Sequence, residues 1–390
     1  MNVLYLDWKS LANNHILNAF KRKDYSVEIF DFSKYKDVKI SEEGTSILVE
    51  KLLSRKYDFC FSFNYFPIVA IACKVCNVKY VSWTFDSPYV FLYSDTVLFP
   101  TNYAFVFDKA EYDNLLTLGV NTVYYLPLAA DTAFYDSIEP ASSNYKKYAS
   151  DISFVGSMYN EPKHRLFDKF DRISPYTKGY LDALLSAQKQ IYGADIMEQG
   201  LSDPIIEELS HDAPILCPSD ELQSRAWVYS KYFLSRELTR RERFEYIKAL
   251  SERFKVDLYT YMPSKELPKV TNKGFADYYK DMPLIFKTSR INLNISLRSI
   301  VTGIPLRCFD IMGCGGFLLT NYQADFDVFF IAGEDYVFYE SCEDLLSKAE
   351  YYLSHDKERK EIAQNGHKKV LESHTYINRL TTIESIIKEG

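Results

Sequence analysis

The stretch GIPLRCFDIMGCGGFLLT, residues 303–320, has the pattern of a short amphipathic helix that breaks at glycines and runs into an apolar strand. Pro305 suits a helix start, because proline at the first helical position forfeits no hydrogen bond. Gly315 and Gly316 then end the helix and allow close packing into the next strand. INLNIS (291–296) supplies a strand before the helix. The order strand, helix, strand predicts one unit of a parallel α/β sheet.

The same alternation runs through most of the chain. Short apolar runs between amphipathic stretches predict strands at residues 2–8, 25–32, 57–63, 78–85, 103–108 and 121–128. A second series begins with DISFVGSMYN (151–160) and continues with strands at 255–261, 291–296 and 316–321. We therefore expect an α/β protein with two doubly wound domains, which leave a cleft for a ligand.

Shifts in composition set the expected boundaries. The first domain is predicted at 1–135, and 136–150 reads as a linker because it loses apolar periodicity and gathers Pro, Ser and Lys. The second domain is predicted at 151–373. It contains a mostly helical insertion at about 165–235, where strand signals are missing, and a C-terminal helix follows at 374–390.

Composition also limits the class of function. The net charge of −7 argues against a nucleic-acid partner, which would require a basic face. No segment approaches the roughly 20 apolar residues of a membrane span, and the first residues lack a cationic leader, although peripheral membrane contact stays open. The seven cysteines are odd in number and scattered, which favours reduced thiols. We expect a cytoplasmic protein.

Arg307 and Asp310 are three residues apart, and therefore share one face of the predicted helix. An arginine grips a phosphate with two parallel hydrogen bonds, and a carboxylate one turn deeper accepts from two neighbouring hydroxyls, as on a ribose. With the free N–H groups of the helix start and with Gly315 and Gly316, these residues predict a nucleoside-diphosphate site. The alternative is a surface ion pair, with the glycines serving only as a cap.

Two further pairs of polar positions stand at expected strand ends. Gly156 and Ser157 follow the strand at the start of the second domain, where their backbone would face a diphosphate, or where they would form an ordinary tight turn. Asn292 and Asn294 alternate with apolar residues, and so share one face of a strand. Nucleotide contact and structural hydrogen bonding are equally compatible with this pair.

Long stretches of the chain resemble a known family. RINLNISLRSIVTGIPLRCFDIMGCGGFLLTNYQADF (290–326), with DISFVGSMY (151–159), resembles the C-terminal domain of GT-B glycosyltransferases, specifically the branch of the CgeB-like spore-maturation proteins. The stretches at 62–89 and 126–136 resemble the N-terminal domain that accompanies it. The resemblance implies the GT-B fold, with two Rossmann-like domains facing a cleft and the C-terminal helix packing back on the first.

The resemblance also implies roles for particular residues. In related retaining enzymes this region carries two glutamates separated by seven residues, the second of which holds the donor ribose. Asp310 falls at the second position, while Thr302 occupies the first. A basic residue on this side of the cleft suggests Arg243 as a phosphate ligand, against a solvated helix face as the alternative. By analogy, Gly274 and Phe275 border the base.

The first domain is expected to carry the acceptor side. Asp86 lies just past a strand end, where its carboxylate would meet the sugar or an acceptor hydroxyl, or else cap a turn before Ser-Pro. Asp86 and Arg307 are our two candidate catalytic residues. Asn64 and Tyr65, at another strand end, are candidates to line the acceptor side. His15 is a further candidate, with a structural role as its alternative.

We expect a glycosyltransferase, of the hexosyl or N-acetylhexosaminyl class, that takes a UDP-sugar and an unidentified glycan, protein or small-molecule acceptor. A nucleotide-sugar epimerase on the same fold and a non-catalytic sugar-binding or scaffold protein are the alternatives. CKVC (73–76) lacks a second cysteine pair and favours core packing. Because no His, Cys and carboxylate set has ligand spacing, we expect no metal and no cofactor beyond the nucleotide sugar.

Overall fold

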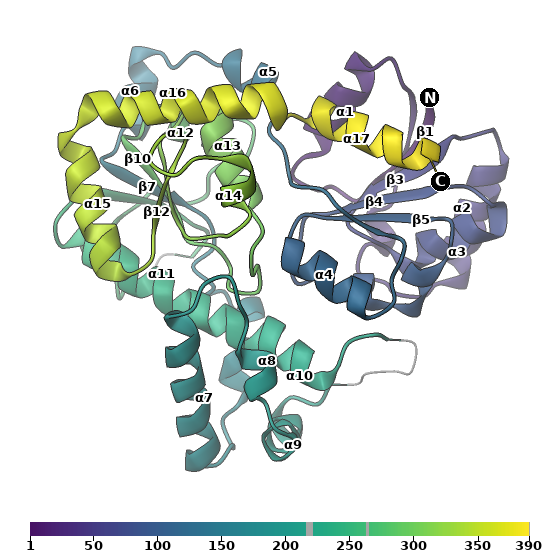
Figure 1. Ribbon diagram of the computed structural model, residues 1–390, viewed down its shortest axis with the longest axis horizontal. Helices are drawn as coiled ribbons and strands as arrows, with labels where there is room; N and C mark the ends of the chain where they lie inside the picture. The colour runs from purple at the N-terminus through teal and green to yellow at the C-terminus, as the bar shows by residue number, and fades with distance from the viewer. Residues whose placement is uncertain (216–220, 263–264, 390) are drawn as a thin grey trace. The chain divides into compact units, whose positions relative to one another are not determined.

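The computed structural model describes residues 1–215, 221–262 and 265–389. The chain forms two compact units, drawn in Figure 1. The first consists of Met1–Ala130, the segment from His374 onward, and a short stretch around Glu221. The second takes the intervening chain from Asp131 to Ser373.

The first unit is built on a six-stranded parallel sheet in the order β2-β1-β3-β4-β5-β6. Its strands are β1 (Asn2–Asp7), β2 (Ser26–Asp31), β3 (Phe59–Phe63), β4 (Tyr80–Thr84), β5 (Asn102–Val106) and β6 (Val123–Tyr125). Every residue of β3, β4 and β5 is buried, which explains why these strands read as nearly continuous apolar runs. The helices of this unit are α1 (Asn13–Arg22), α2 (Glu42–Leu53), α3 (Pro67–Cys76), α4 (Lys109–Thr117), α17 (Tyr376–Glu389) and the short turns η1 (Ser33–Tyr35), η2 (Val90–Tyr93) and η3 (Asp95–Leu98).

The second unit has its own six-stranded parallel sheet, in the order β12-β11-β10-β7-β8-β9. Its strands are β7 (Ile152–Val155), β8 (Val256–Tyr259), β9 (Thr271–Asn272), β10 (Ile291–Asn294), β11 (Leu318–Asn321) and β12 (Val337–Tyr339). The helices around it are α5 (Thr132–Asp136), α6 (Ser142–Tyr148), η4 (Pro162–His164), η5 (Leu166–Lys169), α11 (Ser235–Ser251), α12 (Met282–Thr288), α13 (Leu306–Gly313), α14 (Phe326–Phe329), α15 (Cys342–Ser354) and α16 (Asp356–Ser373). Two parallel sheets flanked by helices confirm the predicted fold class.

The predicted insertion is a helical subdomain with a core of its own. It contains α7 (Pro175–Lys189), α8 (Met197–Gly200), α9 (Asp203–Asp212), α10 (Arg225–Val228) and the π-helix η6 (Tyr229–Leu234), which runs directly into α11 (Figure 1). Its buried apolar residues include Leu181, Leu185, Leu209 and Phe233, which form a cluster separate from that of the second sheet.

The unit boundaries differ from the sequence interpretation. Residues 136–150 contain helix α6 and belong to the second unit, and the chain passes between units at Ala130 instead. The polar composition that suggested a linker reflects a short, exposed helix. Strands β9 and β12 escaped prediction because they span only two and three residues.

Helix α17 packs beside α1 in the first unit (Figure 1). The ring of Tyr376 stacks on His15 with centroids 5.7 Å apart, and Lys23 pairs with Glu384 at 3.2 Å. Within the described residues, no helix combines the length and apolar character that crossing a membrane requires.

Candidate functional site

The carboxyl ends of the second sheet bring the predicted donor residues together. β7 ends at Val155 and leads into Gly156, while β10 ends at Asn294 and leads through a loop to α13. Parallel strands end at the same edge of a sheet, which is where ligands of such sheets bind. Pro305 is the N-cap of α13, so the helix starts at Leu306, one residue later than the sequence suggested.

Arg307 lies against Gly156 at this edge. A Cβ atom on Gly156 would lie 2.5 Å from Nη1 of Arg307, so the missing side chain makes room for the guanidinium. The Nε atom of Arg307 is buried without a hydrogen-bond partner. Burial and the neighbouring Arg243 lower the pKa of Arg307 from its ordinary value. The site therefore holds positive charge that the protein itself does not fully compensate.

Arg243 reaches the same loop from helix α11. Its Nη1 donates to the carbonyl of Ser157 at 2.5 Å, and its Nη2 donates to the carbonyl of Ile295 at 2.5 Å. Its guanidinium faces the ring of Tyr159, 4.7 Å from the centroid. These partners are neutral, and burial lowers the pKa of Arg243. Arg243 is only 7% exposed, which contradicts the alternative of a solvated helix face, and its contact with a phosphate stays a prediction.

The loop after β7 is held in an unusual backbone conformation. Tyr159 has a φ of +55°, which few residues other than glycine adopt. Its N–H donates to Oγ of Ser157 at 2.8 Å, and that hydroxyl donates to Glu161 at 2.7 Å. Ser157 thus fixes the loop through its side chain, while its carbonyl receives Arg243. Two like-charged guanidinium groups beside such a loop suit an anion.

Asp310 lies one turn along α13 from Arg307 and is 2% exposed. Its Oδ1 accepts from the hydroxyl of Tyr135 at 2.7 Å and from that of Tyr278 at 3.2 Å. Burial, followed by the charge of Asp310, raises the pKa of Tyr135. The carboxylate therefore accepts from two hydroxyls, but these belong to tyrosines of the same unit. Its contact with a ribose stays a prediction.

Asn292 and Asn294 make structural hydrogen bonds. Nδ2 of Asn292 donates to the carbonyl of Phe286 at 3.1 Å, and its Oδ1 accepts from Ser153 at 2.9 Å. Nδ2 of Asn294 donates to Thr320 at 2.9 Å. Both side chains are buried, so the structural alternative accounts for them without a ligand.

Gly315 and Gly316 lie apart from Gly156 and from the start of α13. Gly315 and Gly316 follow the C-terminal end of α13, away from the helix start. The N–H of Gly316 donates to the carbonyl of Ile311, and a Cβ atom on Gly316 would lie 2.7 Å from the carbonyl oxygen of Phe286. Cap geometry and close packing therefore account for both.

Gly274 and Phe275 lie in the loop after β9. The φ of Gly274 is +78°, which favours glycine. Phe275 is exposed and stacks on the exposed ring of Tyr261, with centroids 4.7 Å apart. Contact of this exposed aromatic pair with a base stays a prediction.

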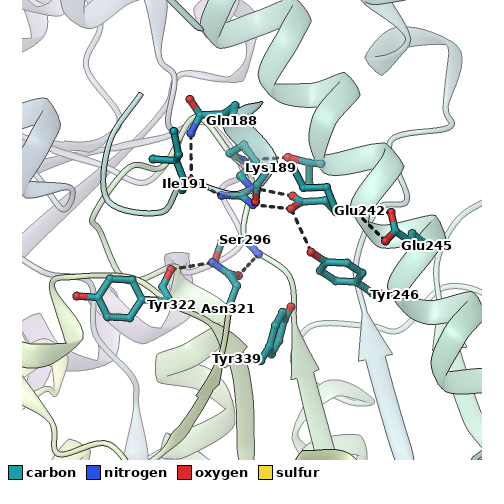
Figure 2. A network of polar contacts seen from close by, with 12 residues as sticks. Gln188, Lys189, Ile191, Glu242, Glu245, Tyr246, Ser296, Asn321, Tyr322 and Tyr339 are labelled. Carbon is teal, nitrogen blue, oxygen red and sulfur yellow. Dashed lines mark hydrogen bonds and ion pairs between the residues drawn. The ribbon is translucent and has the colours of Figure 1, made fainter. Parts of the chain in front are cut away.

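Arg298 is a second buried arginine, and a carboxylate within the protein neutralises its charge. Figure 2 shows the polar contacts around that carboxylate, Glu242. Nε and Nη2 of Arg298 donate to Glu242 at 2.8 and 2.5 Å. Nη1 and Nη2 also donate to the carbonyls of Ile191 and Lys189 at 3.0 and 2.9 Å. Arg298 thus ties the loop after β10 to α11 and to the end of α7. No sequence pattern predicts this role of Arg298, because its partners lie far away along the chain.

Arg240 and Arg241 of α11 form conventional ion pairs. Arg240 and Arg241 both donate to Glu237, at 2.8 and 2.7 Å, and Arg241 also pairs with Asp182 at 2.9 Å. These pairs account for the acidic and basic mixture in the sequence of this helix. They leave Arg243 as the residue of this group that reaches the loop after β7.

On the carboxyl edge of the first sheet, Asn64 and Asp86 lie together. Nδ2 of Asn64 donates to Asp86 at 2.7 Å, and its Oδ1 accepts from the N–H of Phe85 at 2.9 Å. Asn64 has a φ of +58°, which brings its side chain across to the end of β4. Asp86 is exposed. Asn64 therefore acts as a support for Asp86.

Two acceptor candidates are inside the first unit. Tyr65 is fully buried, and its hydroxyl is 2.9 Å from that of Thr96. Burial raises the pKa of Tyr65 well above its ordinary value. His15 is buried between α1 and α17 against Tyr376. Both positions favour a structural role, because neither side chain faces solvent within its unit. Over the described residues, no group of three or more His, Cys, Asp or Glu side chains is arranged to hold a metal ion.

The comparisons with known proteins agree with this architecture. Residues 236–385 match a family model described as glycosyl transferase-like. This range includes Arg243, Arg307 and Asp310. No curated protein matches the chain.

Solved structures of similar architecture cover the whole chain. One is Alr3699/HepE of Anabaena in complex with UDP, with a TM-score of 0.56, 10% sequence identity and 100% of both chains covered. Another is sucrose-phosphate synthase from Thermosynechococcus elongatus, with a TM-score of 0.54, 10% identity and coverage of 100% of this chain and 98% of that one. A glycosyltransferase from Rickettsia africae gives 0.52 at 10% identity, with 100% and 98% covered. At these identities the similarity establishes the GT-B fold.

Proposed function

We propose that this protein is a glycosyltransferase that transfers a sugar from a nucleotide-sugar donor to an acceptor. The observation that carries the proposal is the pair of arginines beside Gly156 at the carboxyl edge of the second sheet: Arg243, which is buried, and Arg307, which is half-buried with its Nε atom buried and unpartnered. A buried guanidinium without a carboxylate partner is costly unless an anion completes it. The glycosyl transferase-like match covers both arginines, which supports the same conclusion.

We propose a UDP-sugar as the donor. The structural neighbour HepE was crystallised with UDP and with UDP-glucose, and it shares the fold over its whole length. The finer proposals are transfer of a hexosyl or N-acetylhexosaminyl group, retention of configuration and membership of the CgeB-like branch. The cytoplasm is the proposed location.

In the proposed reaction, Arg307 and Arg243 bind the diphosphate and stabilise the charge that develops as the sugar leaves. The first N–H groups of α13 add partial positive charge at the same edge. We assign this neutralisation to the arginines, with no metal taking part. Asp86, supported by Asn64, is proposed to orient the acceptor hydroxyl or to accept its proton.

Thermal unfolding across nucleotides tests the proposal. A nucleotide that binds only the folded state raises the unfolding temperature, and a concentration of a hundred times Kd adds about 2.7 kcal/mol of stability. We expect UDP and UDP-sugars to stabilise the protein, and Arg307→Met to abolish most of the shift. An unchanged unfolding temperature with every nucleoside diphosphate would contradict the proposal.

Product analysis distinguishes the related activities. Incubation with a UDP-sugar and acceptor extracts should release UDP in an acceptor-dependent manner. A changed sugar without an acceptor would identify an epimerase instead. Binding of UDP without turnover in any extract would identify a non-catalytic binding protein.

A further inference from the structure

The loop after β7 brings a histidine to the proposed diphosphate site. The rings of His164 and Tyr159 meet edge to face, with centroids 5.2 Å apart. Tyr159 in turn faces the guanidinium of Arg243 at 4.7 Å. Because Tyr159 contacts both residues, the imidazole belongs to the same group of side chains as the two arginines of that site.

Two nitrogen atoms near this histidine are buried without partners. Nδ1 of His164 is buried and makes no hydrogen bond, and the same is true of Nε of Arg236 on α11. Buried polar atoms normally have partners, and exceptions concentrate where a ligand, ion or water is missing. The imidazole itself is only half-buried, so the ring retains access to solvent.

The charges around His164 come from two elements. Arg236 and Arg243 approach from α11, and Lys163 and Glu161 belong to its own loop and turn. Burial lowers the pKa of His164, with Arg236 as the second cause; Glu161 acts in the opposite direction. The imidazole is therefore neutral near pH 7 in the free protein.

We propose that His164 is a further catalytic residue, which binds the diphosphate of the leaving group and takes up a proton when the nucleoside diphosphate forms. This inference rests on the proposed glycosyl transfer. In that reaction the bond between the sugar C1 and the phosphate oxygen breaks, and its electron pair stays on the phosphate. A bond forms between C1 and the acceptor oxygen, and the acceptor hydroxyl loses its proton to Asp86, the proposed base, or to solvent.

The charge on the ligand explains why His164 would respond. The diphosphate of a nucleotide sugar carries two negative charges, and the released nucleoside diphosphate carries a third at neutral pH. A nearby negative charge raises the pKa of an imidazole. His164 then takes a proton from solvent, which adds a charge-assisted hydrogen bond to the product and offsets the like charge of Arg236.

Calorimetric titration with UDP tests this inference. The heat of binding, measured in buffers of different ionisation enthalpy, gives the number of protons taken up. We expect the wild-type protein to take up more protons than His164→Gln, which keeps a neutral hydrogen-bonding side chain. His355→Gln removes an exposed histidine of the same unit and should match the wild type. Because UDP itself titrates equally in all three experiments, the difference isolates His164.

The dependence on pH gives a second measure. As pH rises from the His164 pKa of the free protein to its higher pKa in the complex, wild-type affinity for UDP should fall relative to that of His164→Gln, by about tenfold for each unit by which binding raises the histidine pKa. Histidine NMR titration of the wild-type protein, with and without UDP, supplies the same pKa without any substitution. Equal proton uptake in wild type and His164→Gln, or an NMR pKa that UDP does not raise, overturns the inference. Absence of UDP binding to the wild type contradicts the proposed function itself.

Discussion

Two buried arginines, Arg243 on helix α11 and Arg298 beside that helix, differ in whether a carboxylate contacts them. Arg298 is 8% exposed and contacts Glu242 of this helix, while Arg243 of the helix is 7% exposed and contacts only neutral groups through its hydrogen bonds. Burial opposes the charge on both. For Arg298, burial is the largest single influence, but the hydrogen bonds to Glu242, the charge of Glu242 and the nearby Tyr192 and Tyr246 together outweigh it and raise the pKa. For Arg243, burial prevails and lowers the pKa.

The difference distinguishes an arginine whose charge the protein itself neutralises from arginines whose charge it leaves without a carboxylate partner. Arg298 has a carboxylate, two carbonyls and the ring of Tyr192 at 3.9 Å, so its environment is complete without a ligand. The hydrogen bonds of Arg243 go only to carbonyl groups, and Nε of Arg307 makes none. An external anion would supply for these two residues what Glu242 supplies for Arg298.

Removal of Arg298 should have the largest effect, and on stability. Arg298→Met would leave Glu242 buried without its partner, which costs about 3 to 5 kcal/mol of unfolding free energy. Urea unfolding measures this loss, and Arg298→Met combined with Glu242→Gln should recover part of it. UDP affinity per folded molecule should stay close to that of the wild type. Unchanged stability with weakened UDP binding would reverse the assignment of the two arginines.

Arg307→Met should have the opposite profile. It removes a charge-assisted contact worth about 1.5 to 3 kcal/mol, so UDP affinity should fall by about 10- to 100-fold. The unfolding free energy of the ligand-free protein should not fall, because the substitution removes a cation beside Arg243. Calorimetric titration and urea unfolding of the same sample report both quantities. A variant that is destabilised but binds UDP normally would show that Arg307 is structural.

Two glycine substitutions sharpen the same distinction. In Gly156→Ala the new methyl group meets the movable end of Arg307, so UDP affinity should fall by several-fold, and the φ of +158° at this position adds backbone strain that lowers stability as well. In Gly316→Ala it meets backbone oxygen atoms, and overpacking should cost about 1 to 3 kcal/mol of stability without a specific effect on UDP. Thermal melts and UDP titrations of both variants check the contrast. Identical profiles for the two would show that Gly156 does not serve the site.

The smallest expected effect concerns Asp310. If its carboxylate also accepts from the ribose, Asp310→Asn should weaken UDP binding by about fivefold and leave 2′-deoxy-UDP binding nearly unchanged. The two tyrosine contacts predict a stability loss of about 1 kcal/mol in the same variant. Tyr135→Phe is the matched control, because it removes one internal contact and keeps the carboxylate. An equal loss for both nucleotides would limit Asp310 to its internal role.

The regular α/β alternation made the fold predictable from the sequence. Buried parallel strands such as β3 and β4 are almost wholly apolar, so each run is visible by itself. The edge of the second sheet followed from the same pattern, because Gly156 and the start of α13 lie directly after predicted strands. Residues fixed by local sequence were therefore found.

Partners that are distant along the chain were not predictable in this way. Whether Asn292 contacts a nucleotide or Ser153 depends on which strand lies beside it. Tyr65 follows strand β3 and His15 lies in helix α1, as the sequence pattern indicated. Their side chains nevertheless point into the core of the first unit. His164 lacked a signal because a single histidine in a loop has no pattern. Its proposed role depends on Tyr159 and Arg236, which the fold brings close to it.

The path of the chain has a consequence for how the protein forms during translation. Apart from the short stretch around Glu221, the chain leaves the first unit at Ala130, forms the second unit and returns to the first at His374; the N–H of Ala130 donates to the carbonyl of His374 at 3.0 Å. Helix α17, which covers α1, therefore emerges from the ribosome only after the whole second unit. Until then the apolar surface around His15 is uncovered. A stop codon near residue 373 would consequently leave the second unit whole and damage the unit that was synthesised first.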